Sequence, residues 1–184
     1  MLVLGIDPDL HTTGWAAYDS NLRKVIAVGC LKVPRKLTGF DAIEATMVKC
    51  RSECWGGIVN VLVVEGQELY LGNTKNTRSI LDLALCAGAL MGTTYTGSGD
   101  ILCPKPAEWK GQVPKYIHHK RILDGLGVAS YRVGVTKSTF AILPEKDSLH
   151  LLPDGDRLKN GDWKHVTDAI GLAIWGAEKI KHSR

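Results

Sequence analysis

The chain has 184 residues, of which 45% are hydrophobic and 23% charged, and its formal net charge is +4. These values are ordinary for a globular protein, and the length suffices for one domain with a sizeable core. No apolar run reaches the roughly 18 residues of a membrane-spanning helix, and no basic segment followed by an apolar one marks a secretory signal. We therefore expect one domain over residues 1–184, located in the cytoplasm and without a membrane partner.

Cysteine content and charge distribution give information about the cellular compartment and the binding partners. The five cysteines are an odd number and contain no Cys-x-x-Cys pair, which favours reduced, mostly buried thiols in a cytosol-like compartment. The small positive net charge says little about partners. Basic side chains and histidines crowd one short region, however, which predicts a phosphate-binding surface or, as the alternative, a solvated loop. This basic cluster consists of Lys105, Lys110, Lys115, His118, His119, Lys120 and Arg121.

The first third of the chain predicts three strands and a helix. The strands are expected at residues 2–6, 14–18 and 25–33, because short apolar runs there are separated by turn residues. A helix is predicted from Thr38 or Asp41 to about Cys54, with an inward face of Phe40, Ile43, Met47 and Val48 or Cys50. Residues 59–64 are continuously apolar, which is typical of a strand covered on both faces of a sheet.

The remainder predicts alternating helices and strands. A polar loop over residues 66–75 is followed by a helix over about 77–91, with an inward face of Ile80, Leu81, Ala84, Leu85, Gly88 and Leu90. A strand at 101–103 and short helices near 107 and over 116–126 come next. Residues 128–161 fit either a β-hairpin insertion or a mobile loop. The last helix is expected from Trp163 to about Lys181, with Asp162 as its N-cap. This order predicts an α/β fold, a mixed sheet with helices on both faces.

Acidic residues occupy three related positions. Asp7 and Glu65 each end a strongly apolar strand, and Asp168 lies early on the last helix, three residues after His165. If the two strands are neighbours, three carboxylates and an imidazole can converge at one sheet edge. Carboxylates that close repel one another unless a cation neutralises them. Mg²⁺ suits such oxygen ligands, and two ions about 4 Å apart can drive phosphodiester hydrolysis.

Each of these residues also has an ordinary structural explanation. Asp7 could form a turn, His165 could be a capping or solvated side chain, and Asp168 could complement the helix dipole. Glu65 is harder to explain in this way, because glutamate is a poor turn residue. The combination of the four residues in this order is more specific than any one of them.

Several segments resemble the RuvC family of Holliday-junction resolvases, within the ribonuclease H-like superfamily. Residues 4–8 read Leu-Gly-Ile-Asp-Pro and lead to Thr13-Gly14, which is similar to the family's Gly-Ile-Asp-Pro-Gly-x-x-x-Thr-Gly signature. Asp9 stands where the family usually has glycine and adds a carboxylate near the site. Residues 76–79, 106–110 and 165–169 resemble the family's later motifs. The stretch 109–115 and the insertion at about 128–161 are more similar to the phage-encoded branch.

The resemblance implies a ribonuclease H-like fold with a five-stranded mixed sheet, and a crossover junction endonuclease that nicks branched DNA. It implies Mg²⁺ as cofactor, with Mn²⁺ as a substitute and two ions per active site. The implied metal ligands are Asp7, Glu65, His165 and Asp168. The substrate class is four-way junctions, with forks and flaps as alternatives, and the location would be a bacterial host cytoplasm if the chain is phage-encoded.

The resemblance also implies contacts to DNA and to a second copy of the chain. Lys110 would steady the scissile phosphate, and Lys115 or Lys120 would be a second phosphate contact, with Arg121 beside them in the basic cluster. Tyr70 is the candidate aromatic residue for stacking at the junction, with a loop anchor as the alternative. The family acts as a two-fold homodimer. The helix after Asn76 is a candidate dimer face, although the core explains its apolar residues equally well.

Three other interpretations remain open at this point. The chain could be another ribonuclease H-like nuclease that acts on flaps, Y-forks or RNA–DNA hybrids. It could be a nucleotide-binding protein of the actin and sugar-kinase class, but that fold needs two such domains and a second glycine-rich phosphate loop. It could also be a non-enzymatic DNA binder, although all four metal-site positions carry residues that are able to bind metal.

Overall fold

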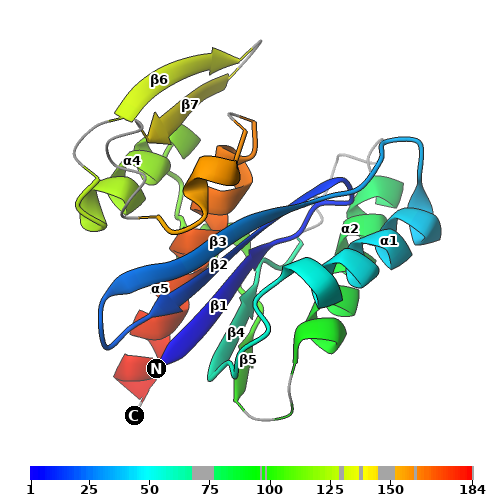
Figure 1. Ribbon diagram of the computed structural model, residues 1–184, viewed down its shortest axis with the longest axis horizontal. Helices are drawn as coiled ribbons and strands as arrows, with labels where there is room; N and C mark the ends of the chain where they lie inside the picture. Colours follow the sequence, from blue (N-terminus) through cyan, green and yellow to red (C-terminus); the bar gives the residue numbers. More distant parts are fainter. Residues whose placement is uncertain are drawn as a thin grey trace.

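The computed structural model describes residues 1–67, 77–95, 97, 99–128, 131–136, 139–144, 152–159 and 161–183. Its centre is a five-stranded sheet with the strand order β3-β2-β1-β4-β5 (Figure 1). The strands β1 (Leu2–Asp7), β2 (Thr12–Asp19) and β3 (Lys24–Lys32) form an antiparallel meander. The strands β4 (Val61–Val64) and β5 (Asp100–Leu102) continue the sheet parallel to β1. The predicted mixed five-stranded sheet is confirmed.

Helices cover both faces of this sheet. The long helix α5 (Trp163–Ser183) packs on one face, while α1 (Gly39–Glu53) and α2 (Thr77–Thr94) lie together on the other (Figure 1). The strand residues alternate between two cores, since Val3 joins the α5 side and Leu4 and Ile6 join the α1 and α2 side. Both cores need apolar side chains, which explains why β1 and β4 are continuously hydrophobic.

The remaining elements follow β5 and precede α5 in the chain. They are the short helix α3 (Pro106–Trp109), the helix α4 (Lys115–Gly125), the strands β6 (Tyr131–Thr136) and β7 (Thr139–Pro144), and a 3-10 turn (Gly155–Arg157). The strands β6 and β7 pair as an antiparallel hairpin beside α4, apart from the main sheet (Figure 1). Of the two interpretations of residues 128–161, the described parts match the hairpin. No helix in the described ranges is long and apolar enough to span a membrane.

The inward face predicted for α1 is wrong in part. Phe40 and Val48 are 79% and 58% exposed, whereas the buried residues of α1 are Ala42, Ile43, Thr46 and Cys50. The buried Thr46 hydroxyl donates to the Ala42 carbonyl oxygen at 2.8 Å, so its polar group is satisfied inside the helix. The apolar periodicity fits two rotations of this helix, and packing against α2 and β3 selects the one with smaller side chains inward.

The inward face predicted for α2 is also wrong in part. Leu90 is buried as expected, but Leu81 and Leu85 are 53% and 50% exposed. Cys86 and Ala87 are buried in their place, on the side that packs toward α1 and β4. The helix is apolar around most of its circumference, so the hydrophobic pattern alone does not decide which side faces the core.

Neither predicted helix cap forms with its side chain. Thr38 occupies the N-cap position of α1 but makes no side-chain cap hydrogen bond. Asp162 directly precedes α5, and its Oδ2 atom instead accepts hydrogen bonds from the Lys159 N–H at 2.9 Å and from Lys32 Nζ at 2.7 Å. The carboxylate therefore ties β3 to the segment that leads into α5.

Two glycines of the opening motif let α5 lie directly on the sheet. A Cβ atom on Gly5 would come within 2.1 Å of the Ala169 carbonyl oxygen, and one on Gly14 within 2.3 Å of the His165 carbonyl oxygen. Real Cβ atoms do not approach backbone this closely, so both positions require glycine as long as α5 keeps its place. The close contact sets the depth at which the first turns of α5 meet the end of β1.

We expect Gly5→Ala to destabilise the protein by about 1–3 kcal/mol, the usual cost of overpacking a core. The added methyl group must push α5 away from β1, because the atom it meets belongs to backbone. Thermal unfolding followed by circular dichroism measures this change. Gly56→Ala is the matched control, since a Cβ atom on Gly56 meets nothing within 4 Å. Equal melting temperatures for the two variants would contradict this account of Gly5.

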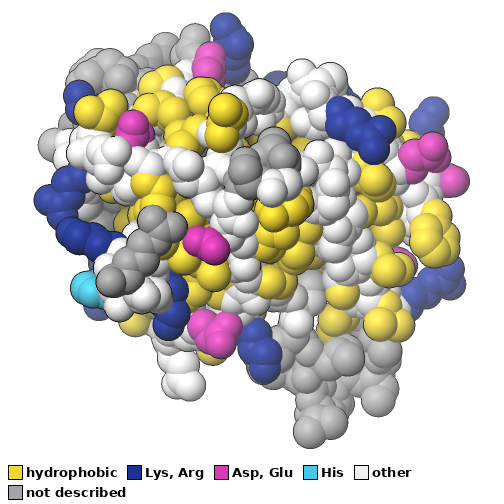
Figure 2. Space-filling view, turned by 90° about the horizontal axis from the view of Figure 1, so that it is seen from below, with side chains coloured by type: hydrophobic (Ala, Val, Ile, Leu, Met, Phe, Trp, Pro, Cys, Tyr) yellow, Lys and Arg dark blue, Asp and Glu magenta, His cyan; other side chains and the backbone are white. Residues whose placement is uncertain are grey.

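The surface combines charged and apolar residues. In the view from below, hydrophobic side chains run through the middle of the face, and lysine and arginine side chains lie mostly around its edge (Figure 2). All five cysteines are free, but Cys103 is exposed and Cys30 and Cys54 are only half-buried. The expectation of reduced thiols is met, while that of mostly buried thiols holds fully for Cys50 and Cys86 alone.

Candidate active site

The parallel pairing of β1 and β4 brings two carboxylates together. Ile6 is in register with Val64, and the Glu65 N–H donates to the Ile6 carbonyl oxygen at 3.1 Å. Asp7 and Glu65 therefore lie beside each other at the carboxyl ends of adjacent strands, as their positions in the sequence predicted. Both are mainly buried, with exposed fractions of 7% and 8%. This edge of a parallel sheet is where α/β proteins commonly bind ligands.

The first turns of α5 add the other two predicted residues. His165 Nδ1 lies 2.8 Å from Asp7 Oδ2, and Asp168 is buried three residues further along the same helix. The charges of Glu65 and Asp168 both act on Asp7. All four acidic or imidazole side chains expected at the site thus gather at one end of β1, β4 and α5.

Two lysines and two further polar side chains bind these carboxylates. Lys110 Nζ lies 2.8 Å from Glu65 Oε1, and Trp109 Nε1 donates to the same oxygen at 3.0 Å. Asp168 pairs with Lys115 through Oδ2. Its other oxygen, Oδ1, lies 2.9 Å from His119 Nε2. Each carboxylate is therefore held by at least one cation or donor from another element.

Burial and neighbouring charge affect the two aspartates in opposite ways. Burial raises the pKa of Asp7 to about 6, assisted by the charges of Asp168 and Glu65 and opposed by His165. Burial also acts to raise the pKa of Asp168, but the hydrogen bond from His119 and the charge of Lys115 outweigh it and hold that pKa well below its usual value. The ionised form of Asp7 is therefore disfavoured, mainly by burial, and a bound cation would stabilise it.

The donor set fits a hard divalent cation, but the side chains are not arranged as a finished metal site. Carboxylate oxygens are the ligands that Mg²⁺ prefers, and Asp7, Glu65 and Asp168 provide them here. Within the described parts of the chain, no three histidine, cysteine, aspartate or glutamate side chains converge closely enough to hold an ion. Lys110 contacts Glu65 Oε1, and Lys115 and His119 contact the two oxygens of Asp168.

The other predicted DNA contacts separate into three groups. Lys115 lies at the site, whereas Lys120 is exposed on α4 and lies 3.2 Å from Asp124 on the same helix, so Lys115 is the second lysine at the carboxylates. Arg121 is exposed on α4 and contributes to a neighbouring groove instead. Tyr70 lies outside the described residues, and its role stays a prediction.

Asp9 is held within the turn that follows β1. Its Oδ1 atom accepts hydrogen bonds from the N–H groups of His11 and Thr12 at 2.8 and 3.0 Å. The Thr13 hydroxyl donates to the Asp9 carbonyl oxygen at 2.7 Å. Such side-chain-to-backbone bonds stabilise a turn, so the Asp9 carboxylate is used in the turn rather than added to the site.

Sequence reasoning did not assign Trp109 and His119 to the site. Trp109 directly precedes Lys110, and the Lys110 ammonium lies 4.9 Å from the centre of the Trp109 ring. His119 follows Lys115 by four residues, which places both on one face of α4. That spacing was the available signal for His119, whereas nothing in the sequence indicates that the Trp109 indole reaches Glu65.

Comparisons with known proteins agree at the level of the fold. No protein-family model and no curated protein matches the sequence. Thermus thermophilus RuvC in complex with a Holliday junction substrate matches with a TM-score of 0.67 and 14% identity, covering 100% of this chain and 96% of that chain. A second structure of Thermus thermophilus RuvC matches with a TM-score of 0.61 and 15% identity, with 100% and 97% coverage.

The two structural matches cover the whole chain at very low sequence identity, so they are evidence for the fold alone. They agree with the five-stranded mixed sheet and its flanking helices, which the opening motif predicted by resemblance. The chain has the fold of the RuvC Holliday junction resolvases.

Proposed function

We propose that this protein is a metal-dependent endonuclease that nicks branched DNA, with four-way junctions as its principal substrate. The observation that carries the proposal is the placement of Asp7, Glu65 and Asp168, from β1, β4 and α5, within electrostatic range of one another and beside two lysines. Three carboxylates and two ammonium groups at one sheet edge are suited to phosphodiester hydrolysis. The RuvC-like fold around them supports branched DNA as the substrate class.

Mg²⁺ is the proposed cofactor, with Mn²⁺ as a substitute and two ions per site. Asp7, Glu65, His165 and Asp168 are the proposed ligands. When bound, such ions activate a water molecule and stabilise the leaving oxygen of a phosphodiester. Lys110 now contacts Glu65 Oε1, and Lys115 and His119 contact the two oxygens of Asp168, so bound ions would share or replace some of these contacts.

The chain's own residues position the reacting groups. His165 orients Asp7, Trp109 orients Glu65, and His119 orients Asp168 through the hydrogen bonds described above. Lys110 and Lys115 supply positive charge beside the carboxylates, where an incoming phosphate would otherwise be repelled. Because these groups are already held in position, little free energy is spent on rearranging the site when the substrate binds.

The decisive test is cleavage of a panel of labelled substrates in Mg²⁺ or in EDTA. The panel contains a four-way junction, a Y-fork, a flap, an RNA–DNA hybrid and a linear duplex. We expect paired, symmetric nicks in the junction that disappear in EDTA. Cleavage of forks and flaps at equal rates would identify a broader debranching nuclease, and cleavage of the hybrid alone would favour a ribonuclease H activity. No cleavage of any substrate would contradict the proposal.

A two-fold homodimer completes the proposal, because two symmetric nicks need two active sites. The exposed face of α2 is the candidate interface. Leu81 and Leu85 are half exposed there, and Tyr95 just beyond the helix is 43% exposed. Added Cβ atoms on Gly88 and Gly92 would meet nothing within 4 Å, so a second helix can approach closely along this face.

We expect Leu85→Glu to weaken the dimer at least about ten-fold, because a charge would be buried at the interface. Analytical ultracentrifugation measures the association. Junction nicking should then become unpaired, with one strand cut at a time. Ile58→Glu is the control, since Ile58 is 76% exposed outside α2. A wild-type protein that is monomeric at all concentrations would contradict the dimer.

The cytoplasm stays the proposed location, since the free cysteines are compatible with a reducing compartment. The similarity to the phage-encoded branch likewise stays a prediction, as does the assignment of residues 1–184 to a single nuclease domain.

A further inference from the structure

A groove between α4 and α5 lies next to the proposed active site. It has a volume of about 540 Å³, within the range of roughly 300–1,000 Å³ that is typical of small-ligand sites. On α4 it is lined by residues spaced three and four apart, from His118 to Leu126, and on α5 by a matching series from Gly171 to Glu178. Arg23, in the turn between β2 and β3, also lines it. We call this feature the α4–α5 groove.

Aromatic side chains form much of its wall. Trp175 on α5 is half-buried, whereas Trp109 and Tyr18 are buried, each with an exposed fraction of 8%. The ring of His118 meets that of Trp109 edge-on, with centroids 4.8 Å apart. Burial lowers the pKa of His118 to about 4, so this imidazole is neutral near pH 7 and adds aromatic surface. Planar apolar walls of this kind suit a stacked base.

The rim of the groove is positively charged. Arg23 and Arg121 are both exposed, and Glu178 is the acidic residue among those that line the groove. Within the described part of the chain, neither arginine forms an ion pair with a carboxylate. Their guanidinium groups are therefore available for phosphate, which arginine binds through two parallel hydrogen bonds.

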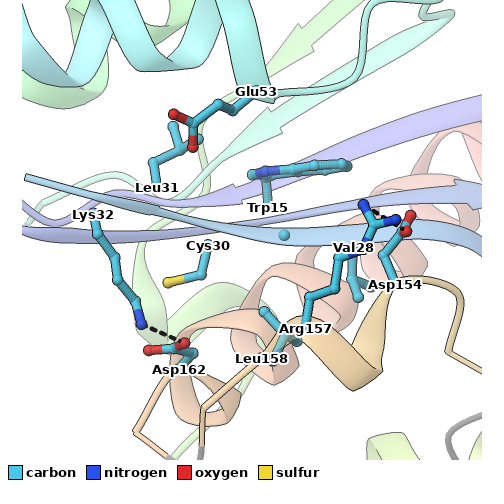
Figure 3. A pocket seen from close by; sticks show the side chains of 11 residues that line it. Trp15, Val28, Cys30, Leu31, Lys32, Glu53, Asp154, Arg157, Leu158 and Asp162 are labelled. Atoms are coloured by element: carbon cyan, nitrogen blue, oxygen red, sulfur yellow. Dashed lines mark ion pairs between the residues drawn. The ribbon is translucent and has the colours of Figure 1, made fainter.

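A second groove of similar size differs from the α4–α5 groove in how its charged side chains are paired. It lies along β3, has a volume of about 500 Å³ and contains both basic and acidic side chains (Figure 3). Its charges are already paired, since Lys32 Nζ lies 2.7 Å from Asp162 Oδ2 and Arg157 Nη1 lies 3.3 Å from Asp154 Oδ1. Charge complementarity therefore favours an anionic ligand in the α4–α5 groove and not in the groove along β3.

The α4–α5 groove shares one side chain, Trp109, with the site of the carboxylates. The Trp109 indole lines the groove, while its Nε1 atom donates to Glu65 at 3.0 Å. Gly171, one turn after Asp168 on α5, lets α5 pack closely here, because a Cβ atom would lie 2.7 Å from Trp109 Cζ3 and 2.6 Å from Ile122 Cδ1. Trp109, which is 8% exposed, is therefore part of both the wall of the groove and the surroundings of Glu65.

We propose that the α4–α5 groove binds unpaired nucleotides of the DNA strand, with a base against Trp175 and phosphates at Arg23 and Arg121. This inference rests on the proposed function, because it assigns the groove to the strand that passes through the active site. Stacking tolerates any base, so the groove accepts single-stranded DNA without sequence preference. The enzyme would thereby favour branch points that can expose a few unpaired nucleotides.

The test measures binding of a fluorescently labelled oligothymidylate to the full-length protein in EDTA, where cleavage cannot interfere. Trp175→Ala and Arg23→Ala should each weaken this binding about ten-fold, the size expected for a lost base stack or phosphate contact. Trp175→Phe should restore most of the affinity, since a ring remains. Arg157→Ala, in the groove along β3, is the matched control and should bind like the wild type. Melting temperatures establish that each variant is folded.

Unchanged affinity of folded Trp175→Ala and Arg23→Ala would overturn the proposal. An equal loss for blunt duplex would also overturn it, because the groove would then be a general contact for phosphates. Binding of free thymidine monophosphate that does not compete with the oligothymidylate would overturn the assignment to a DNA strand. The readout is independent of cleavage, so a protein that cuts nothing can still pass this test, and a working nuclease can fail it.

Discussion

Replacing Asp7 by asparagine should abolish metal-dependent cleavage of four-way junctions while DNA binding stays equal or becomes tighter. Asp7 lies between Glu65, Asp168 and His165, where asparagine keeps the shape but loses the charge that a cation requires. Losing about 3 kcal/mol of transition-state stabilisation lowers the rate about 100-fold. Binding does not suffer, since one negative charge that repels phosphate is removed. Single-turnover cleavage and equilibrium binding to the same labelled junction measure the two effects.

Glu65→Gln should behave in the same way, because it removes the neighbouring carboxylate of the same site. Asp41→Asn is the matched control, since Asp41 is exposed in the first turn of α1, far along the chain from the proposed ligands. Substantial cleavage by either Asp7→Asn or Glu65→Gln in Mg²⁺ would remove the assignment of these carboxylates to the reaction.

The Asp7→Asn variant should also be more stable than the wild type at high pH in EDTA. The pKa of Asp7 rises from 3.8 to about 6 on folding, so the folded protein resists ionisation of this group. Stability is therefore lost as pH rises from about 4 to 6, and the full cost of about 3 kcal/mol applies above that range. Asparagine removes the cost, so melting temperatures of the two proteins should differ at pH 8 and converge toward pH 4. A difference that does not depend on pH would contradict this reasoning.

Lys110→Ala should slow junction cleavage about 100-fold while weakening junction binding by less than about ten-fold. Lys110 Nζ lies 2.8 Å from Glu65 and above the Trp109 ring, which fixes its charge beside the proposed active site. A fixed donor that acts where charge develops contributes to the transition state. In DNA binding, Lys110 is one of several cations on and next to α3 and α4, so removing it lowers the affinity only in part. Single-turnover rates at saturating enzyme separate the two effects.

Lys49→Ala provides the comparison for Lys110→Ala. Lys49 pairs with Glu53 at 2.7 Å on the exposed side of α1, so it has the same kind of ion pair away from the carboxylates. The Lys49→Ala variant should cleave and bind the junction like the wild type. Equal losses of rate and affinity in Lys110→Ala would reduce Lys110 to an ordinary phosphate contact.

The sequence by itself determined the strands and the positions of the acidic residues. Apolar runs of strand length ending at Asp7 and Glu65 already require two buried strands with carboxylates at their ends. The final helix was equally clear, because Val166, Ala169, Ile170 and Ala173 repeat at helical spacing and are all buried. These features are local or periodic, so they can be predicted without knowing what packs against them.

Only the tertiary structure decided which helix faces are buried and which side chains hold the carboxylates. Phe40 and Leu85 look like core residues in the sequence but are exposed, because packing selects one of several apolar faces. Trp109 and His119 reach Glu65 and Asp168 across 44 and 49 residues of sequence. Contacts over such separations depend on how α3, α4 and α5 dock against the sheet, and no local pattern of residues encodes that arrangement.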